Sequence, residues 1–172
     1  MKKRPAQAIS RKVLDRKNLG FFLAGFVEGE GSFNVSLRKK SDYKVNWQVV
    51  LSFNVSQKDP SILYLLKKEL DSGIIKTRKD GLRSLDVTNP QELLKKVIPY
   101  FTKYPLLSKS KIYNFNIFCK ISKIVQNGGH RNTEGLKEIL LLREKLNEGK
   151  GRTRKYKYED VFPNKKSSET IR

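Results

Sequence analysis

The stretch that decides the fold is Leu19-Gly-Phe-Phe-Leu-Ala-Gly-Phe-Val-Glu-Gly-Glu-Gly31. Residues 19–27 carry no charge, and a helix that is apolar on nearly every face must be buried on all sides. The segment is too short to span a membrane. Gly25 and Gly29 are four residues apart and share one helical face. Because glycine costs about 1 kcal/mol in a helix interior, this pair indicates that another backbone approaches closely there.

Two carboxylates, Glu28 and Glu30, end this helix at the negative end of its dipole, where a positive group must compensate them. Read in order, Leu23-Ala-Gly-Phe-Val-Glu-Gly-Glu-Gly31 resembles the LAGLIDADG motif of homing endonucleases, with glutamate at both acidic positions. The resemblance extends to about residue 125, because the order of the elements that follow is that of the family. An inactive relative that keeps the fold is the alternative interpretation.

Composition restricts the class of partner. The chain has 172 residues, enough for one domain with a core, and its net charge is +20. Such an excess of Lys and Arg indicates a polyanion, with nucleic acid first, although ribosomal and membrane-surface proteins share it. No apolar run reaches transmembrane length, so we expect no membrane partner. Cys119 and His130 are the only residues of their types, which excludes an internal disulfide and Cys-rich or two-His metal sites within this chain.

The pattern after the motif predicts the remaining elements. Strict alternation over residues 32–38 and 45–56 predicts a long hairpin with one apolar face. Asp59-Pro60 then begins a helix, and residues 74–79 and 82–88 form a second hairpin. Further helices follow from Asn89-Pro90, towards residue 126 and over residues 132–147. This order predicts an α+β domain with a four-stranded antiparallel sheet, helices on one face and the other face open. The family has the same order, αββαββα, with a saddle-shaped sheet.

The composition divides the chain into three segments. We expect residues 1–18 to form a basic N-terminal arm, 19–148 a single domain, and 149–172 a basic flexible tail. A final contact of the tail would run through Tyr156, Tyr158, Val161 and Phe162.

The polar faces of both hairpins are the predicted reader of DNA. Antiparallel sheets commonly leave such a face simply solvated, but amide side chains flanked by Arg and Lys suit base edges and phosphates better. The predicted DNA contacts are Ser32, Asn34, Ser36, Arg38, Lys40, Asn46, Gln48, Asn54, Lys76, Arg78, Ser84, Asp86 and Lys111.

The resemblance implies the catalytic residues. Glu30 is the metal ligand, helped by the backbone carbonyl of Gly29, and Gln57 orders water. Lys109 stabilises charge at the cut phosphate, with Lys111 as its close competitor. Some relatives carry an arginine four residues after the glutamine, where this chain has Ser61. Hard oxygen ligands suit Mg²⁺; we expect Mn²⁺ to substitute and Ca²⁺ to bind without supporting cleavage.

A single motif copy implies a homodimer, as in family members of this type. The expected interface is Leu23, Ala24, Gly25, Val27 and Glu28. The chain would cut both strands of a long pseudo-palindromic DNA across the minor groove, leaving 3′ overhangs. From strand length, the target covers about 16–22 base pairs.

Such a protein would be encoded in a mobile intron, in a chloroplast or mitochondrion, or otherwise in a bacterial or archaeal cytoplasm. An intron maturase that binds its own intron RNA is the main alternative, and a non-cleaving transcription regulator is the third.

Overall fold

The computed structural model describes residues 15–148 and 153–163, and it confirms the predicted α+β architecture. The elements in order are α1 (Arg16–Glu30), β1 (Gly31–Lys39), β2 (Trp47–Gln57), α2 (Ser61–Leu70), β3 (Ile74–Thr77), β4 (Arg83–Val87), α3 (Pro90–Glu92), η1 (Leu93–Val97), α4 (Ile98–Lys103), α5 (Lys109–Gln126), η2 (Gly129–Arg131), α6 (Thr133–Glu144) and α7 (Tyr158–Val161).

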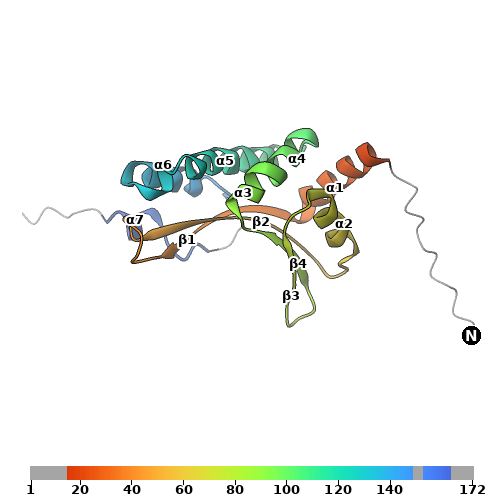
Figure 1. Ribbon diagram of the computed structural model, residues 1–172, viewed down its shortest axis with the longest axis horizontal. Helices are drawn as coiled ribbons and strands as arrows, with labels where there is room; N and C mark the ends of the chain where they lie inside the picture. Colours follow the sequence, from red (N-terminus) through yellow and green to blue (C-terminus); the bar gives the residue numbers. More distant parts are fainter. Residues whose placement is uncertain (1–14, 149–152, 164–172) are drawn as a thin grey trace, which may run out of the picture.

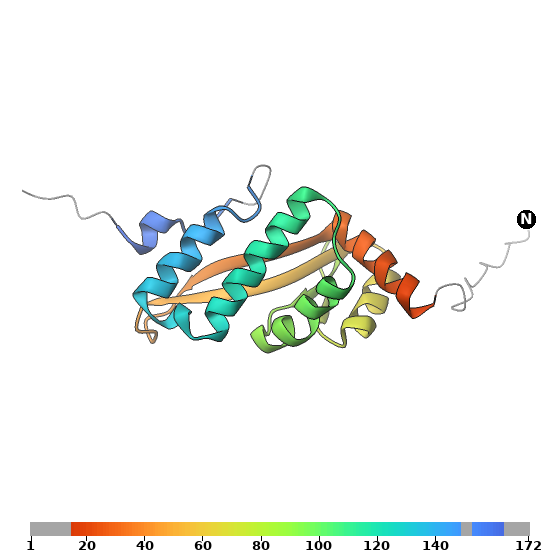
Figure 2. The same cartoon turned by 90° about the horizontal axis from the view of Figure 1, so that it is seen from above.

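The four strands form one antiparallel sheet in the order β1-β2-β4-β3. Alternation places Phe33, Leu51 and Phe53 on the buried face. There the ring of Phe33 contacts the rings of Phe53, Phe101 and Phe118. Figure 1 shows the helices stacked on this face, and Figure 2 shows α5 and α6 lying across the long β1–β2 hairpin. In the described ranges no helix covers the opposite face, which is left open and polar, as predicted.

Helix α1 begins at a cap, since Asp15 Oδ1 accepts a hydrogen bond from the Asn18 N–H at 2.8 Å. The close approach within the chain falls on Gly20, where an added Cβ would lie 2.3 Å from the ring of Tyr104. At Gly25 and Gly29 an added Cβ would meet no atom of the described chain within 4 Å. These two glycines therefore face outward.

Three residues assigned by sequence to a dimer interface are used in the chain's own core. Leu23, Ala24 and Val27 are buried on the face of α1 that packs onto the sheet. That part of the interface prediction is wrong, because α1 is apolar on nearly every face and the sequence does not show which face turns inward.

Helices α3, η1 and α4 form one continuous helical stretch. Asn89 caps it by accepting from the Gln91 N–H at 2.9 Å, as the Asn-Pro pair predicts. Residues Leu93–Val97 form a π-helical turn that ends one residue before the Ile98–Pro99 pair at the start of α4. A proline inside a helix removes a donor and crowds the preceding turn, and a wider turn at that place relieves the conflict.

Side chains protect the free edge of β1, which pairs with another strand on one side only. Lys111 Nζ donates to Gly31 O at 2.6 Å, Asn147 Nδ2 to Phe33 O at 3.0 Å, and Arg143 Nε to Val35 O at 2.9 Å. Three alternate carbonyls of the edge are thus satisfied by the helical layer, which blocks pairing with a further strand.

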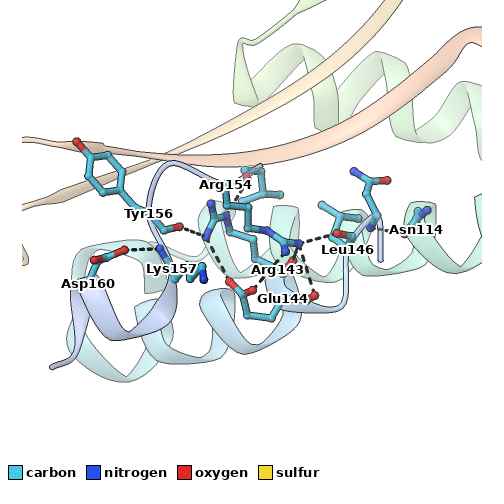
Figure 3. Close-up of polar contacts among 10 residues, drawn as sticks. Asn114, Arg143, Glu144, Leu146, Arg154, Tyr156, Lys157 and Asp160 are labelled. Atoms are coloured by element: carbon cyan, nitrogen blue, oxygen red, sulfur yellow. Dashed lines mark hydrogen bonds and ion pairs between the residues drawn. The ribbon is translucent and has the colours of Figure 1, made fainter. Parts of the chain in front are cut away.

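Residues 153–163 pack onto the domain at the end of the long hairpin (Figures 2 and 3). Arg154 Nη2 donates to Leu146 O at 2.7 Å, and its guanidinium pairs with Glu144 at 3.3 Å. The Tyr156 ring packs edge-on against Trp47, 4.9 Å between centroids.

The predicted contact of the tail is therefore confirmed, with Tyr158, Val161 and Phe162 also partly buried against the core. The prediction of a flexible tail is wrong for residues 153–163. Residues 149–152, residues 164–172 and most of the N-terminal arm lie outside the described residues.

Boundaries differ from the sequence prediction at the hairpin turns. Strand β2 begins at Trp47, because Asn46 has a φ of 58° and turns the chain, and β3 ends at Thr77, so Arg78 lies in a turn. Over the described ranges, the helices are all too short or too polar to cross a bilayer.

Candidate active site and nucleic-acid interface

The candidate catalytic groups meet where α1 runs into the sheet. Gly31 pairs with Val55, so Glu30 at the end of α1 lies beside the end of β2, which closes with Gln57. Glu30 is exposed there. The last carbonyls of a helix have no intrahelical partner, which leaves the Gly29 carbonyl free to act together with this carboxylate. The sequence-predicted pair Glu30 and Gly29 is thus brought to one exposed point.

Lys111 is the lysine that reaches this point. Its Nζ donates to Gly31 O at 2.6 Å, and burial lowers the pKa of its ammonium while the charges of Glu28 and Glu30 act to raise it. Lys109 is the exposed first residue of α5 and lies two residues away, about 200° around the helix. Of the two candidate lysines, the structure therefore places Lys111 beside the end of α1 and leaves Lys109 exposed at the start of α5.

Glu28 holds the start of α5. Its carboxylate accepts from Leu107 N at 2.9 Å, from Ser108 N at 3.2 Å and from the Ser108 hydroxyl. Burial alone would raise the pKa of Glu28, but these hydrogen bonds and the charge of Lys111 hold the pKa below its ordinary value. Glu28 therefore binds within its own chain, to the residues one helical turn before Lys111. Its assignment to a dimer interface stays a prediction.

Arg83 supplies a cation that the sequence analysis missed. It lies directly opposite Gln57 in the β2–β4 pair, and its Nη1 donates to Lys58 O at 3.0 Å. Ser61, at the position where some relatives have arginine, begins α2 and donates its N–H to Asp59 Oδ1 at 2.9 Å. Only the pairing of β2 with β4 brings residue 83 to this place, so no local pattern could have identified it.

Most of the predicted DNA contacts share the open face of the sheet. The register pairs Ser32 with Asn54 and Arg38 with Gln48 across β1–β2, and Asn54 with Asp86 across β2–β4. Residues directly opposite each other lie on one face. The contacts on this face are Ser32, Asn34, Ser36, Arg38, Gln48, Asn54, Lys76, Ser84 and Asp86. Lys40, Asn46 and Arg78 lie in the hairpin turns, and Lys111 lies at the catalytic end.

One chain does not complete a metal site. Within the described ranges no three His, Cys, Asp or Glu side chains converge in a way that could hold an ion. Glu30 and the Gly29 carbonyl are hard oxygen donors of the kind that Mg²⁺ prefers. They fit such an ion only if a second chain or a DNA phosphate supplies the remaining ligands.

Comparison with known proteins identifies a family that this chain matches. A family model described as LAGLIDADG endonuclease matches residues 23–122. The chain is 34% identical to probable intron-encoded endonuclease 2 of Neurospora crassa over 84% of this chain and 33% of that protein. It is 31% identical to DNA endonuclease I-CvuI of Chlorella vulgaris over 77% of this chain and 81% of that protein.

Among solved structures, I-SmaMI, a LAGLIDADG homing endonuclease bound to cleaved DNA, superposes with a TM-score of 0.72 at 32% identity. The match covers 77% of this chain and 45% of the I-SmaMI chain. The chain therefore spans about a third of the Neurospora relative and less than half of I-SmaMI.

Proposed function

This chain belongs to the LAGLIDADG endonuclease family, and we propose that it is a site-specific DNA endonuclease that acts as a homodimer. The observation that carries the proposal is the position of Glu30 and Lys111 at the start of β1, beside the end of β2 that carries Gln57, at one end of an open polar sheet. A net charge of +20 supports a nucleic-acid partner. We expect the target to be double-stranded, because the sheet face presents amide, hydroxyl and cationic groups that suit a major groove.

The chemistry is hydrolysis of a phosphodiester bond in each strand. Glu30 and the Gly29 carbonyl would hold a divalent ion such as Mg²⁺, which would supply Lewis-acid catalysis and an activated water. Glu30 provides the anionic ligand, and the ammonium of Lys111 stabilises the negative charge that develops on the scissile phosphate. The amide of Gln57 can orient the attacking water by hydrogen bonding.

A second copy of the chain would complete the site. The outward face of α1 carries Gly25, Gly29 and Phe22, whose side chain is 51% exposed. Two such faces in contact would bring two Glu30 carboxylates together, one for each DNA strand. The match to less than half of the I-SmaMI chain supports a two-domain working unit. The symmetric pair would read a pseudo-palindromic target and leave 3′ overhangs.

The test is cleavage in Mg²⁺ of a plasmid carrying the intronless allele of the gene that harbours the coding sequence. We expect a double-strand break by the wild type and none by Glu30→Gln, because the metal loses its anionic ligand. In the proposed dimer, the melting temperature of Glu30→Gln should hold or rise without metal, since the change removes the repulsion between two Glu30 carboxylates. Glu138→Gln, an exposed change on α6, should cut like the wild type.

Cleavage by Glu30→Gln at the wild-type rate would refute the assignment of the site. If the wild type leaves the plasmid intact but binds its own intron RNA, the result supports the maturase hypothesis instead.

A further inference from the structure

The open face of the sheet carries one connected set of polar side chains. Asn54 Nδ2 donates to Asp86 Oδ1 at 2.7 Å, and Asn54 Oδ1 accepts from Asn34 Nδ2 at 3.2 Å. Asp86, Asn54 and Asn34 thus form a chain of hydrogen bonds across β4, β2 and β1, which we call the amide relay. Lys76 on β3 closes its end, with Nζ 2.9 Å from Asp86 Oδ2.

Asp86 fixes the direction of this relay. An ionised carboxylate only accepts hydrogen bonds, so Asn54 must turn its NH₂ group towards Asp86 and its oxygen towards β1. Asn34 must then present its own NH₂ group to that oxygen. Asp86 stays ionised: burial alone would raise its pKa, but hydrogen bonds from Lys76 and Asn54 hold that pKa below its ordinary value.

The direction determines what the relay still offers to a ligand. Asn54 Oδ1 also accepts from the Ser52 hydroxyl at 3.1 Å, and Asn34 Oδ1 accepts from the Ser32 hydroxyl at 3.2 Å and from Asn147 Nδ2 at 3.4 Å. Each amide oxygen has two lone pairs and each NH₂ group two donors. Both oxygens are therefore fully used, while each amide keeps one N–H that donates to no other group of the described residues.

We propose that Asp86 is a positioning residue for specificity: by fixing the direction of the amide relay, it makes the Asn54 and Asn34 amides at the centre of the open face offer N–H donors, and not their oxygens, to base edges. The inference rests on the proposed function. In the major groove, donors match purine N7, guanine O6 and thymine O4, whereas the amino groups of adenine and cytosine require acceptors. If the relay ran in the opposite direction, the amides would expose their oxygens as acceptors, which match the amino groups of adenine and cytosine.

The experiment compares wild type with Asp86→Asn, which keeps the shape of the side chain but can donate as well as accept. Each protein is incubated with a library of DNA duplexes that are randomised over the length of the target. Ca²⁺ is used so that binding occurs without cleavage, and the bound duplexes are sequenced. We expect the wild type to enrich a motif. Asp86→Asn should lose about tenfold discrimination at a short block of adjacent positions and keep the rest.

Two further variants separate the effect of the relay's direction from the effect of a changed charge. Lys76→Met removes the ion pair at the end of the relay and one predicted DNA contact but leaves the Asn54–Asp86 hydrogen bond in place. Binding should therefore weaken, and the motif should persist at the block of positions that faces Asn54 and Asn34. Asp42→Asn removes the same charge from the exposed turn between β1 and β2 and should leave the motif unchanged. The inference is overturned if Asp86→Asn enriches the full wild-type motif. It is also overturned if Lys76→Met loses as much base discrimination at the same positions as Asp86→Asn.

Side-chain NMR of the free protein gives a readout without DNA. The NH₂ resonances of Asn54 and Asn34 should both shift in Asp86→Asn, while the backbone spectrum elsewhere superposes and shows that the variant is folded. An unchanged Asn34 signal overturns the relay. If the wild type itself enriches no motif although the NMR result holds, the proposed function fails, and the specificity role of Asp86 fails with it.

Discussion

At the residue scale, two lysines separated by one residue have different positions. Lys111 donates to the carbonyl at the start of β1, next to the end of α1, whereas Lys109 is exposed at the start of α5. The Glu28 carboxylate accepts hydrogen bonds from Leu107 N and Ser108 N, directly before α5. These bonds fix the rotation of α5 and hence the place of Lys111. A group that stabilises charge must be held in place before the reaction, and only Lys111 is held in this way.

Lys111→Met should therefore reduce single-turnover cleavage by about 100-fold or more, since loss of one preorganised donor to a developing charge costs 10²–10³ in rate. Lys109→Met should cut within a few-fold of the wild type and lose only some affinity at raised salt, as expected for a phosphate contact. The measurement is the cleavage rate with protein in excess over DNA. Equal losses in the two variants would contradict the assignment.

At the element scale, Arg143 joins α6, the edge of β1 and the C-terminal segment. Its side chain is 3% exposed, and it donates to Val35 O at 2.9 Å. It also donates to Tyr156 O at 2.9 Å (Figure 3). Burial lowers the pKa of this guanidinium, Arg154 adds to the lowering, and Glu144 opposes it. The charge is retained in a buried place because three neighbouring groups accept or balance it.

Arg143→Met should lower the free energy of unfolding by about 2–4 kcal/mol, because two carbonyls of the described chain lose their donor in a buried place. Urea denaturation measures the change, with Arg131→Met, an exposed substitution in η2, as the matched control that should stay within about 0.5 kcal/mol of the wild type. A loss no larger than that of the control would show that the edge of β1 does not depend on Arg143.

At the scale of the whole molecule, the outward face of α1 is the surface on which the proposed dimer depends. Gly25 and Gly29 leave room along it, and no described atom of the same chain would touch an added Cβ at either glycine. A substitution at Gly25 can therefore disturb a partner without disturbing the fold. Gly20 is different, because its missing side chain makes room for Tyr104 within the chain.

Gly25→Leu should give a folded monomer, because a leucine between two closely packed helices prevents their approach. Sedimentation should find the wild type at twice the 19.9 kDa of one chain and Gly25→Leu at that mass, with matching circular dichroism spectra. Glu138→Leu, an equally exposed apolar change on α6, should remain dimeric. A wild type that is monomeric both free and on DNA would exclude the homodimer.

The sequence by itself determined the elements and their order, because local patterns report local structure. Alternation over the long hairpin identifies the buried and open faces of the sheet, since side chains in a strand have a period of two. Asn89-Pro90 marks the beginning of a helix by its capping chemistry, and the motif at residues 23–31 identifies the family from contiguous residues.

Only the tertiary structure decided which groups meet. Helix α1 is apolar on nearly every side, so its sequence does not show that Leu23 turns inward while Gly25 turns outward. The partners of Glu28 lie about 80 residues along the chain, and Arg83 reaches Gln57 through strand pairing alone. Such contacts depend on how helices rotate and strands pair when the core packs, and local periodicity carries no information about either.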